Sequence, residues 1–182
     1  MRVVEKSQLM SATEIDRTLQ RLAHEIVEQN HGAENVALIG IRRRGVPLAE
    51  RLAAAIRLIA RAEVPVGTLD ITLYRDDLSL VAQQPVMQSS DVTFPVDDKI
   101  LILVDDVLYT GRTVRAAMNG LFDLGRPRRI QLGVLIDRGH RELPVEAQYV
   151  GRYVQTSELE IVEVRLKEID GEERVMLVER VP

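Results

Sequence analysis

Cysteine and tryptophan are both absent from the 182-residue chain, and histidine occurs only three times. Without cysteine the chain has no disulfide, no thiol nucleophile and no cysteine-ligated metal centre. The histidines, His24, His31 and His140, are spaced too far apart for an H-x-x-x-H zinc motif. We therefore expect no zinc site, and any metal should be a hard cation with oxygen ligands.

Long apolar runs are also missing. No stretch reaches the roughly 18 uninterrupted apolar residues that a membrane span requires, and the N-terminal residues 1–6 lack the apolar region of a signal peptide. We expect a cytoplasmic protein without a membrane partner. Hydrophobic residues still make up 46% of the chain, which is enough for a folded core, and the length fits a single domain over residues 1–182.

Aromatic residues are scarce, at 3% of the chain, so aromatic platforms that stack on single-stranded bases are not expected. The net charge of −4 argues against indiscriminate binding of nucleic acids. However, 21 of the 24 basic residues are arginine, whose forked guanidinium group suits phosphate. The composition is therefore compatible with a local anion site.

Hydrophobic periodicity predicts strands that alternate with helices. A capping-box pattern, Ser11 to Glu14, opens the first helix, and Pro47 suits the first turn of the second. Helical spacing predicts helices over residues 11–27, 47–59 and 114–124. Apolar or alternating runs predict strands over residues 36–39, 64–73, 100–104, 130–136, 162–166 and 175–178.

This alternation predicts an α/β fold with a central, mostly parallel sheet flanked by helices and a ligand crevice at the carboxyl ends of the strands. The last two runs, separated by the turn signal Asp170–Gly171, predict a half-exposed C-terminal hairpin. Residues 74–98 show no period. We interpret them as a flexible lid loop, because compact domains rarely keep about 20 residues without regular structure unless they serve a function. The alternative is a β-hairpin arm.

The loop after the strand at 100–104 carries the most informative chemistry. Asp105 and Asp106 are adjacent carboxylates whose repulsion and desolvation must be offset by a cation or by hydroxyl donors, and a vicinal diol supplies such donors. Thr110 to Thr113 then enter a helix, where free backbone N–H groups, two hydroxyls and the helix dipole suit a phosphate monoester. Together these groups match a ribose 5-phosphate.

An apolar strand that ends in Asp also occurs in nucleoside triphosphatases. That class requires G-x-x-x-x-G-K-[ST], and here Gly45 is followed by Val46 instead of lysine. A G-x-G-x-x-G motif for dinucleotides is absent as well. A polar turn without function remains a weaker alternative.

The run from Ile102 to Gly111 resembles the signature for phosphoribosyl pyrophosphate (PRPP) in type I phosphoribosyltransferases. More narrowly, residues 70–78, 104–113 and 137–144 together resemble the PyrR family. Members of that family regulate pyrimidine operons through RNA and are also uracil phosphoribosyltransferases. The resemblance implies a type I phosphoribosyltransferase fold that converts uracil and PRPP to UMP and diphosphate.

The resemblance also implies roles for individual residues. Asp105 and Asp106 would accept hydrogen bonds from the ribose hydroxyls, and Arg75, at the start of the lid, would add positive charge to the departing diphosphate. Arg75 could alternatively be a solvated loop residue. Mg²⁺ would enter with PRPP and not through a protein metal site. The remaining substrate-binding residues would be Arg42, Arg43, Arg44 and Gly45 for the diphosphate, and the PRPP loop of Val107, Leu108, Tyr109, Thr110, Gly111, Arg112 and Thr113, in which Thr110 to Thr113 would hold the 5-phosphate.

The nucleobase should lie beside Asp137 and Arg138, with Asp137 reading the uracil edge; the alternative is that Asp137 caps the turn after its strand. Many purine-using relatives of the fold have Asp where Tyr109 stands, which favours a pyrimidine. Two other functions stay open. One is a UMP sensor with weak catalysis, and the other is a transferase for another nucleobase.

An RNA surface is the second implication of the resemblance, with UMP promoting binding to the leader of pyrimidine-operon mRNA. Its candidate residues are Arg17, Arg21, His24, Arg138, His140, Arg141 and Arg152. The first three could instead be a solvated helix face. If the role is RNA binding alone, Arg21→Ala and Arg141→Ala should spare UMP synthesis. Glu146 and Gln20 depart from the family pattern, and the family implies a homodimer or higher oligomer.

Overall fold

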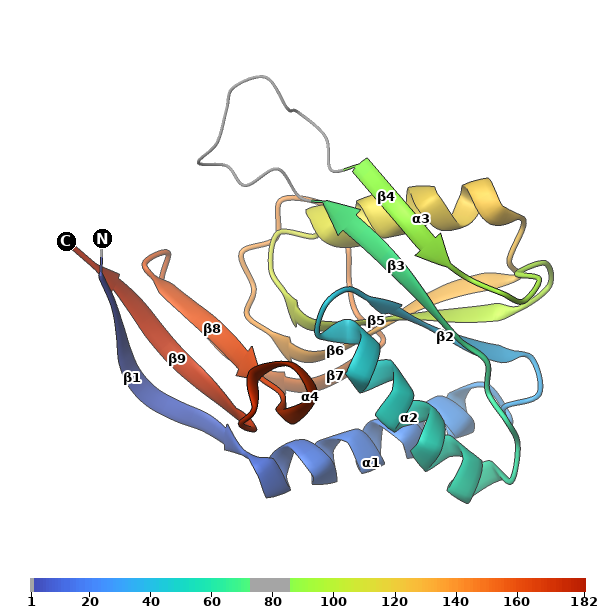
Figure 1. Cartoon of the computed structure of the whole chain (residues 1–182), viewed down its shortest axis with the longest axis horizontal. Coiled ribbons are helices and arrows are strands. Elements are labelled where there is room, and N and C mark those ends of the chain that lie inside the picture. The colour runs from blue at the N-terminus through green and yellow to red at the C-terminus, as the bar shows by residue number, and fades with distance from the viewer. Residues whose placement is uncertain (1, 73–85) are drawn as a thin grey trace.

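The computed structural model describes residues 2–72 and 86–182, which form two β-sheets and four helices (Figure 1). The larger sheet has the strand order β4-β3-β2-β5-β6-β7, in which β3, β2, β5, β6 and β7 run parallel. Its strands are β2 (Val36–Ile41), β3 (Val66–Thr72), β4 (Val86–Asp91), β5 (Ile100–Leu108), β6 (Arg129–Asp137) and β7 (Tyr149–Tyr153). The predicted mostly parallel sheet is confirmed.

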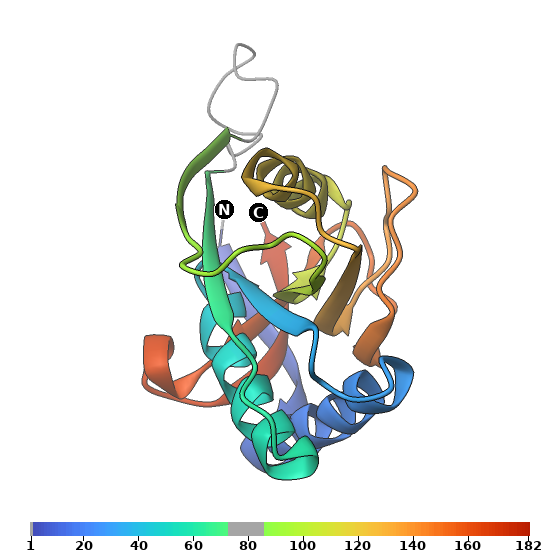
Figure 2. The same ribbon diagram turned by 90° about the vertical axis from the view of Figure 1, so that its right-hand side faces the viewer.

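Helices cover both faces of this sheet (Figure 2). Helices α1 (Ala12–Gln29) and α2 (Gly45–Ala60) pack on one face, and α3 (Arg112–Leu124) packs on the other. Successive residues of β2 point to opposite faces, so that Leu38 packs with α1 and α2 while Ile39 packs with α3. Every residue of β2 is buried, which explains its unbroken apolar sequence.

The residues that the sequence predicts at the starts of the first two helices lie there in the structure. The Glu14 amide donates to Ser11 Oγ over 3.2 Å, as the capping-box pattern predicts. Helix α2 begins at Gly45, two residues before Pro47, so proline occupies the first turn, where its missing N–H costs no helical hydrogen bond.

A second, antiparallel sheet has the order β1-β9-β8 and consists of β1 (Arg2–Ser11), β8 (Glu160–Arg165) and β9 (Arg174–Val181). The pairing of β8 with β9 confirms the predicted hairpin, and the short helix α4 (Lys167–Asp170) lies between these strands. Sequence periodicity did not find β1, which is mostly exposed and pairs with the far end of the chain, Arg2 with Val181. Strand β7 was missed as well.

The predicted lid over residues 74–98 is partly described. Residues 86–91 form β4, which pairs antiparallel with β3 as the hairpin alternative expects. Arg75 and its neighbours lie outside the described residues, and a lid function stays a prediction. None of the helices in the described part of the chain is long and apolar enough to cross a membrane.

Candidate functional site

Three polar loops meet at the carboxyl ends of β2, β5 and β6, where the sequence predicts a ligand crevice. Parallel pairing places Gly40 beside Val104 and Leu108 beside Asp137. The loops that follow these strands are therefore neighbours. The smaller sheet stands next to this edge of the larger one, so the crevice lies between the two sheets (Figure 1).

Asp105 and Asp106 occupy the end of β5 and are both half-buried. The Asp106 amide donates to Asp105 Oδ1 over 2.9 Å, and the Val107 amide donates to Asp106 Oδ1 over 2.8 Å. Burial, reinforced by the negative charge of Asp106, raises the pKa of Asp105. The pair therefore favours a ligand that supplies hydroxyl donors or positive charge. Leu108, which follows, is buried and anchors the strand end in the core.

A cavity of about 440 Å³ opens beside Asp106, between β5 and the smaller sheet. Its walls are mostly polar, and most of the lining residues come from β8, α4 and the turn before β9. The lining residues are Arg44, Asp106, Val162, Glu163, Val164, Arg165, Asp170 and Glu172. The C-terminal residues in this wall were not expected at the site, and only the alternation of Val162 and Val164 with charged residues hinted that one face of β8 is polar.

The basic loop after β2 packs directly against β5 through Gly45. A Cβ atom at Gly45 would lie 2.2 Å from the Val104 carbonyl oxygen, so only glycine allows this approach. The preceding Arg42 and Arg43 are exposed. Arg44, the third arginine of this loop, lines the cavity beside Asp106, whereas Arg42 and Arg43 line another pocket, together with Pro47 and Glu168.

Arg44, by contrast, is held by the C-terminal part of the chain. Its Nη2 lies 2.7 Å from Asp170 Oδ1 and its Nε lies 3.2 Å from Asp170 Oδ2, a forked ion pair that raises the pKa of Arg44. About two turns of helix later, Arg51 forms a second fork with Glu168 over 2.9 and 2.7 Å. These two arginines attach α4 to α2.

The loop after β5 becomes the N-terminus of α3, as the sequence predicts for a phosphate site. Gly111 precedes the helix with a φ of 92°, in the left-handed region that favours glycine. The Arg112 amide donates to Thr110 Oγ1 over 3.3 Å, and Arg112 Nε lies 2.5 Å from Glu142 Oε2. The backbone N–H groups of Arg112 and Thr113 belong to the first turn of α3, where N–H groups and the helix dipole favour an anion.

Asp137 ends β6, and its side chain is only 7% exposed. Its Oδ1 accepts from the Gly139 amide over 3.0 Å, which is the turn cap that the sequence left as an alternative. Its Oδ2 accepts from Arg141 Nη2 over 2.7 Å. Both carboxylate oxygens of Asp137 therefore have a protein donor.

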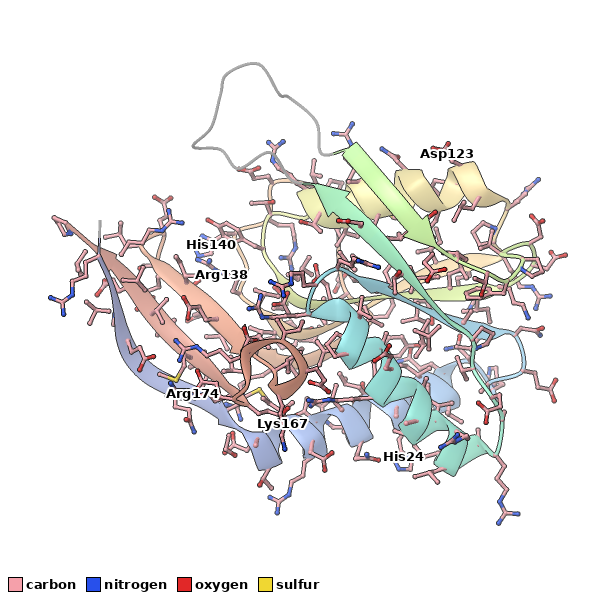
Figure 3. The ribbon with its side chains drawn as sticks, in the orientation of Figure 1. His24, Asp123, Arg138, His140, Lys167 and Arg174 are labelled. Carbon is pink, nitrogen blue, oxygen red and sulfur yellow. The ribbon has the colours of Figure 1, made fainter. Side chains whose placement is uncertain are left out.

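Arg138 is 6% exposed, and burial lowers its pKa. Its Nε donates to Thr156 Oγ1 over 3.1 Å, and its Nη2 donates to the Glu160 carbonyl over 2.6 Å. These contacts direct the guanidinium toward the segment that leads into β8. Figure 3 shows Arg138 and His140 on the side of the larger sheet that faces the smaller one.

Comparison with known proteins identifies the family. The model of the phosphoribosyl transferase domain matches residues 6–169. A bifunctional protein PyrR of Pelotomaculum thermopropionicum is 63% identical over 175 residues, which cover 96% of this chain and 97% of the relative. The chain belongs to the PyrR family. Another PyrR, from Thermus thermophilus, is 57% identical over 96% of this chain and 97% of its own length.

Solved structures confirm that this PyrR family member has the type I phosphoribosyltransferase fold. The hypoxanthine phosphoribosyl transferase of Trypanosoma cruzi matches with a TM-score of 0.76 at 19% identity, over 97% of this chain and 92% of the other. A hypoxanthine phosphoribosyltransferase of Staphylococcus aureus also has a TM-score of 0.76, at 16% identity, over 96% and 92% of the two chains. At these identities the likeness concerns the fold alone.

The RNA surface expected of a PyrR protein divides into two groups. Arg17, Arg21 and His24 are exposed on α1. Arg21 Nη2 donates to the Gly151 carbonyl of β7 over 2.6 Å, and Arg152 of β7 reaches back to Glu14 of α1 over 3.4 Å. These residues form one basic group over α1 and β7.

The second group lies in the loop after β6. His140 is exposed, and its Nε2 lies 2.7 Å from the Thr156 carbonyl oxygen. Figure 3 shows His24 at the α1 side of the molecule, well separated from His140 beside the smaller sheet. Arg138 and Arg141 belong to the same loop as His140 but direct their guanidinium groups into the protein. Of the three predicted residues in this loop, His140 is the exposed one, and Arg152 of the first group pairs with Ile136, two residues before Arg138.

Proposed function

We propose that this chain transfers the ribose 5-phosphate group of PRPP to uracil, with release of diphosphate. The observation that carries the proposal is the loop in which Asp105 and Asp106, at the end of β5, are followed by Thr110 to Thr113 at the N-terminus of α3. Acceptors for a vicinal diol and donors for a phosphate monoester thereby lie a few residues apart. This matches the two ends of a ribose 5-phosphate.

Displacement of diphosphate at the anomeric carbon passes through an oxocarbenium-like state, so catalysis requires stabilisation of the leaving group and exclusion of water. Arg42 and Arg43 are exposed on the loop that Gly45 holds against β5, and they would receive the diphosphate. Arg44 would join them once it leaves Asp170. Arg75 would add charge from the lid.

Mg²⁺ suits this site as a companion of PRPP, and it would neutralise charge on the leaving diphosphate. Burial and the charge of Asp106 raise the pKa of Asp105, and a cation bound beside the pair would favour its ionised form. Within residues 2–72 and 86–182, no group of three or more acidic or histidine side chains is arranged to hold a metal. Asp105 and Asp106 could contribute ligands, and the diphosphate would supply most of the others.

The nucleobase would lie between the loops after β5 and β6. Asp137, at the end of β6, pairs with Leu108 at the end of β5, and Tyr109 directly follows Leu108. Tyr109 is 38% exposed and is not an acid–base group of the kind that a purine ring nitrogen would need. This favours uracil over hypoxanthine, the base named for the structural neighbours.

The second activity that we propose is UMP-dependent binding of the pyrimidine-operon mRNA leader, in the cytoplasm and by a homodimer or higher oligomer. The exposed residues Arg17, Arg21 and His24 on α1, with Arg152 on β7, support it as a group of phosphate-binding side chains. His140 would contribute from the nucleobase loop, where a bound nucleotide could influence it.

Release of diphosphate tests the proposal directly. Purified protein is mixed with Mg²⁺, PRPP and each nucleobase in turn, and diphosphate is measured with time. Turnover confined to uracil is the expected result. Turnover with a purine instead would replace the substrate assignment, and binding of UMP without any turnover would reduce the protein to a sensor.

A further inference from the structure

Arg141 lies in the loop after β6 and directs its guanidinium group into the protein. Its Nε donates to the Val145 carbonyl over 2.9 Å, its Nη1 donates to the Tyr109 carbonyl over 2.7 Å, and its Nη2 donates to Asp137 Oδ2 over 2.7 Å. The side chain is only 23% exposed. Each guanidinium nitrogen therefore has an acceptor within the protein.

These three acceptors belong to three different parts of the nucleobase region. Asp137 ends β6, Tyr109 begins the loop that leads to the phosphate site, and Val145 lies further along the loop of Arg141 itself. The same loop also pairs with the phosphate loop through the Glu142 amide, which donates to the Thr110 carbonyl over 2.9 Å. Arg141 is therefore the charged centre of a junction between the two loops.

The positive charge of Arg141 stabilises the carboxylate of Asp137, which is nearly buried. A buried carboxylate is costly unless a cation and hydrogen-bond donors surround it, and the cation that contacts it is Arg141. Uracil presents an N–H donor between two carbonyl oxygens, so its recognition requires a correctly placed acceptor. The Tyr109 carbonyl and Asp137 Oδ2 are such acceptors, and each oxygen keeps a second lone pair besides the one used by Arg141.

We propose that Arg141 is a positioning residue for uracil, which holds the acceptors of the nucleobase site in place. The inference rests on the proposed transferase function and specifies its nucleobase site. It also differs from the RNA-only role that the sequence suggested for Arg141, under which Arg141→Ala would spare UMP synthesis. A guanidinium engaged by three internal acceptors is poorly placed to serve as a free phosphate ligand.

Steady-state kinetics of Arg141→Gln test this inference. Glutamine keeps much of the side-chain volume but loses the charge and the three-way contact. We expect the KM for uracil to rise about tenfold or more, while the KM for PRPP changes less than about twofold, because misplaced acceptors affect only the group that they contact. Arg141→Lys, which restores the charge toward Asp137, should recover part of the uracil KM. A role confined to general stability would not separate the two KM values.

Controls keep the outcomes distinct. Arg115→Gln replaces an exposed arginine of α3 and should leave both KM values unchanged. If Arg141→Gln does not fold, as judged by circular dichroism, the same separation of KM values is sought in Arg141→Lys. Unchanged uracil KM in the folded variants would overturn the inference. If the native protein shows no turnover with uracil, the transferase proposal fails. Calorimetric binding of UMP then tests Arg141 separately. Weaker UMP binding by Arg141→Gln than by the native protein supports a positioning role for Arg141, and equal binding refutes that role.

Discussion

The guanidinium carbon of Arg138 lies 4.0 Å from the centroid of the Tyr109 ring. The His140 ring meets the same tyrosine edge-on, at 5.7 Å between centroids. Because Arg138 also donates to the carbonyls of Ser157 and Glu160, one cation joins the loop after β5, the loop after β6 and the entry to β8. The proposed nucleobase region and the smaller sheet are therefore packed together around a buried arginine.

Loss of this cation should destabilise the protein. Arg138→Leu removes the donors to two carbonyls and the contact with Tyr109, and we expect the free energy of unfolding to fall by about 2–4 kcal/mol. Urea denaturation followed by circular dichroism measures the change. Arg17→Leu, at an exposed position of α1, should change stability by less than about 0.5 kcal/mol. Equal stability of the two variants would contradict the role given to Arg138.

Asp105 should make stability depend on pH. Its folded pKa is raised, so the unfolded chain loses this proton first, and the free energy of unfolding contributed by Asp105 falls as pH rises from about 4 to the folded pKa. Asp105→Asn should remove this decline and make the variant more stable than the native protein at neutral pH. It should also lower kcat/KM for PRPP about tenfold or more through loss of a ribose acceptor.

Urea denaturation between pH 4 and 8 checks the stability difference, with Asp123→Asn as the matched control. Asp123 is an exposed aspartate next to the last residue of α3, at the opposite end of the helix from the loop that begins at Asp105, and its substitution should leave the pH profile unchanged. If Asp105→Asn and the native protein show the same dependence of unfolding free energy on pH, ionisation of the Asp105 carboxyl does not destabilise the folded protein.

The ion pair between Arg44 and Asp170 should compete with diphosphate for Arg44. Asp170→Asn removes the charge that holds the guanidinium, and we expect the KM for PRPP to fall about twofold to fivefold, since a forked pair of partly exposed groups is modest in strength. Arg44→Ala should raise the same KM. Glu168→Gln breaks the neighbouring fork to Arg51 without touching Arg44, and it should leave the KM unchanged. A higher KM in Asp170→Asn would instead show that Asp170 orients Arg44 for the substrate.

RNA binding should depend on the exposed face of α1. Arg17→Ala is expected to weaken binding of a pyrimidine-operon leader RNA and to reduce the salt dependence of binding by about one unit of slope, as the loss of one phosphate contact does. Uracil transfer should be unaffected, because α1 lies outside the crevice. Filter binding over a series of salt concentrations measures both quantities, with Arg115→Ala of α3 as the control. Equal slopes for the native protein and Arg17→Ala would remove α1 from the RNA surface.

Much of the framework follows from the sequence alone, because it depends on neighbours along the chain. The Ser11 cap, the buried strand β2 and the hairpin of β8 and β9 all have local signatures in periodicity or turn residues. The loop from Asp105 to Thr113 is equally local, since the strand end and the helix start are consecutive. Its resemblance to the PRPP signature needed no long-range information.

Only the tertiary structure decided how distant segments complete the site. Strand β1 has a weak pattern of its own and exists through pairing with β9, and Asp170 reaches Arg44 across 126 positions of sequence. Arg138 and Arg141 look like surface residues in a sequence, because the burial of an arginine depends on acceptors that the fold brings to it. Helices, strands and turns depend mainly on residues that are close in sequence, so the sequence predicts them. The partners of a buried charge come from distant segments, and only the folded structure identifies them.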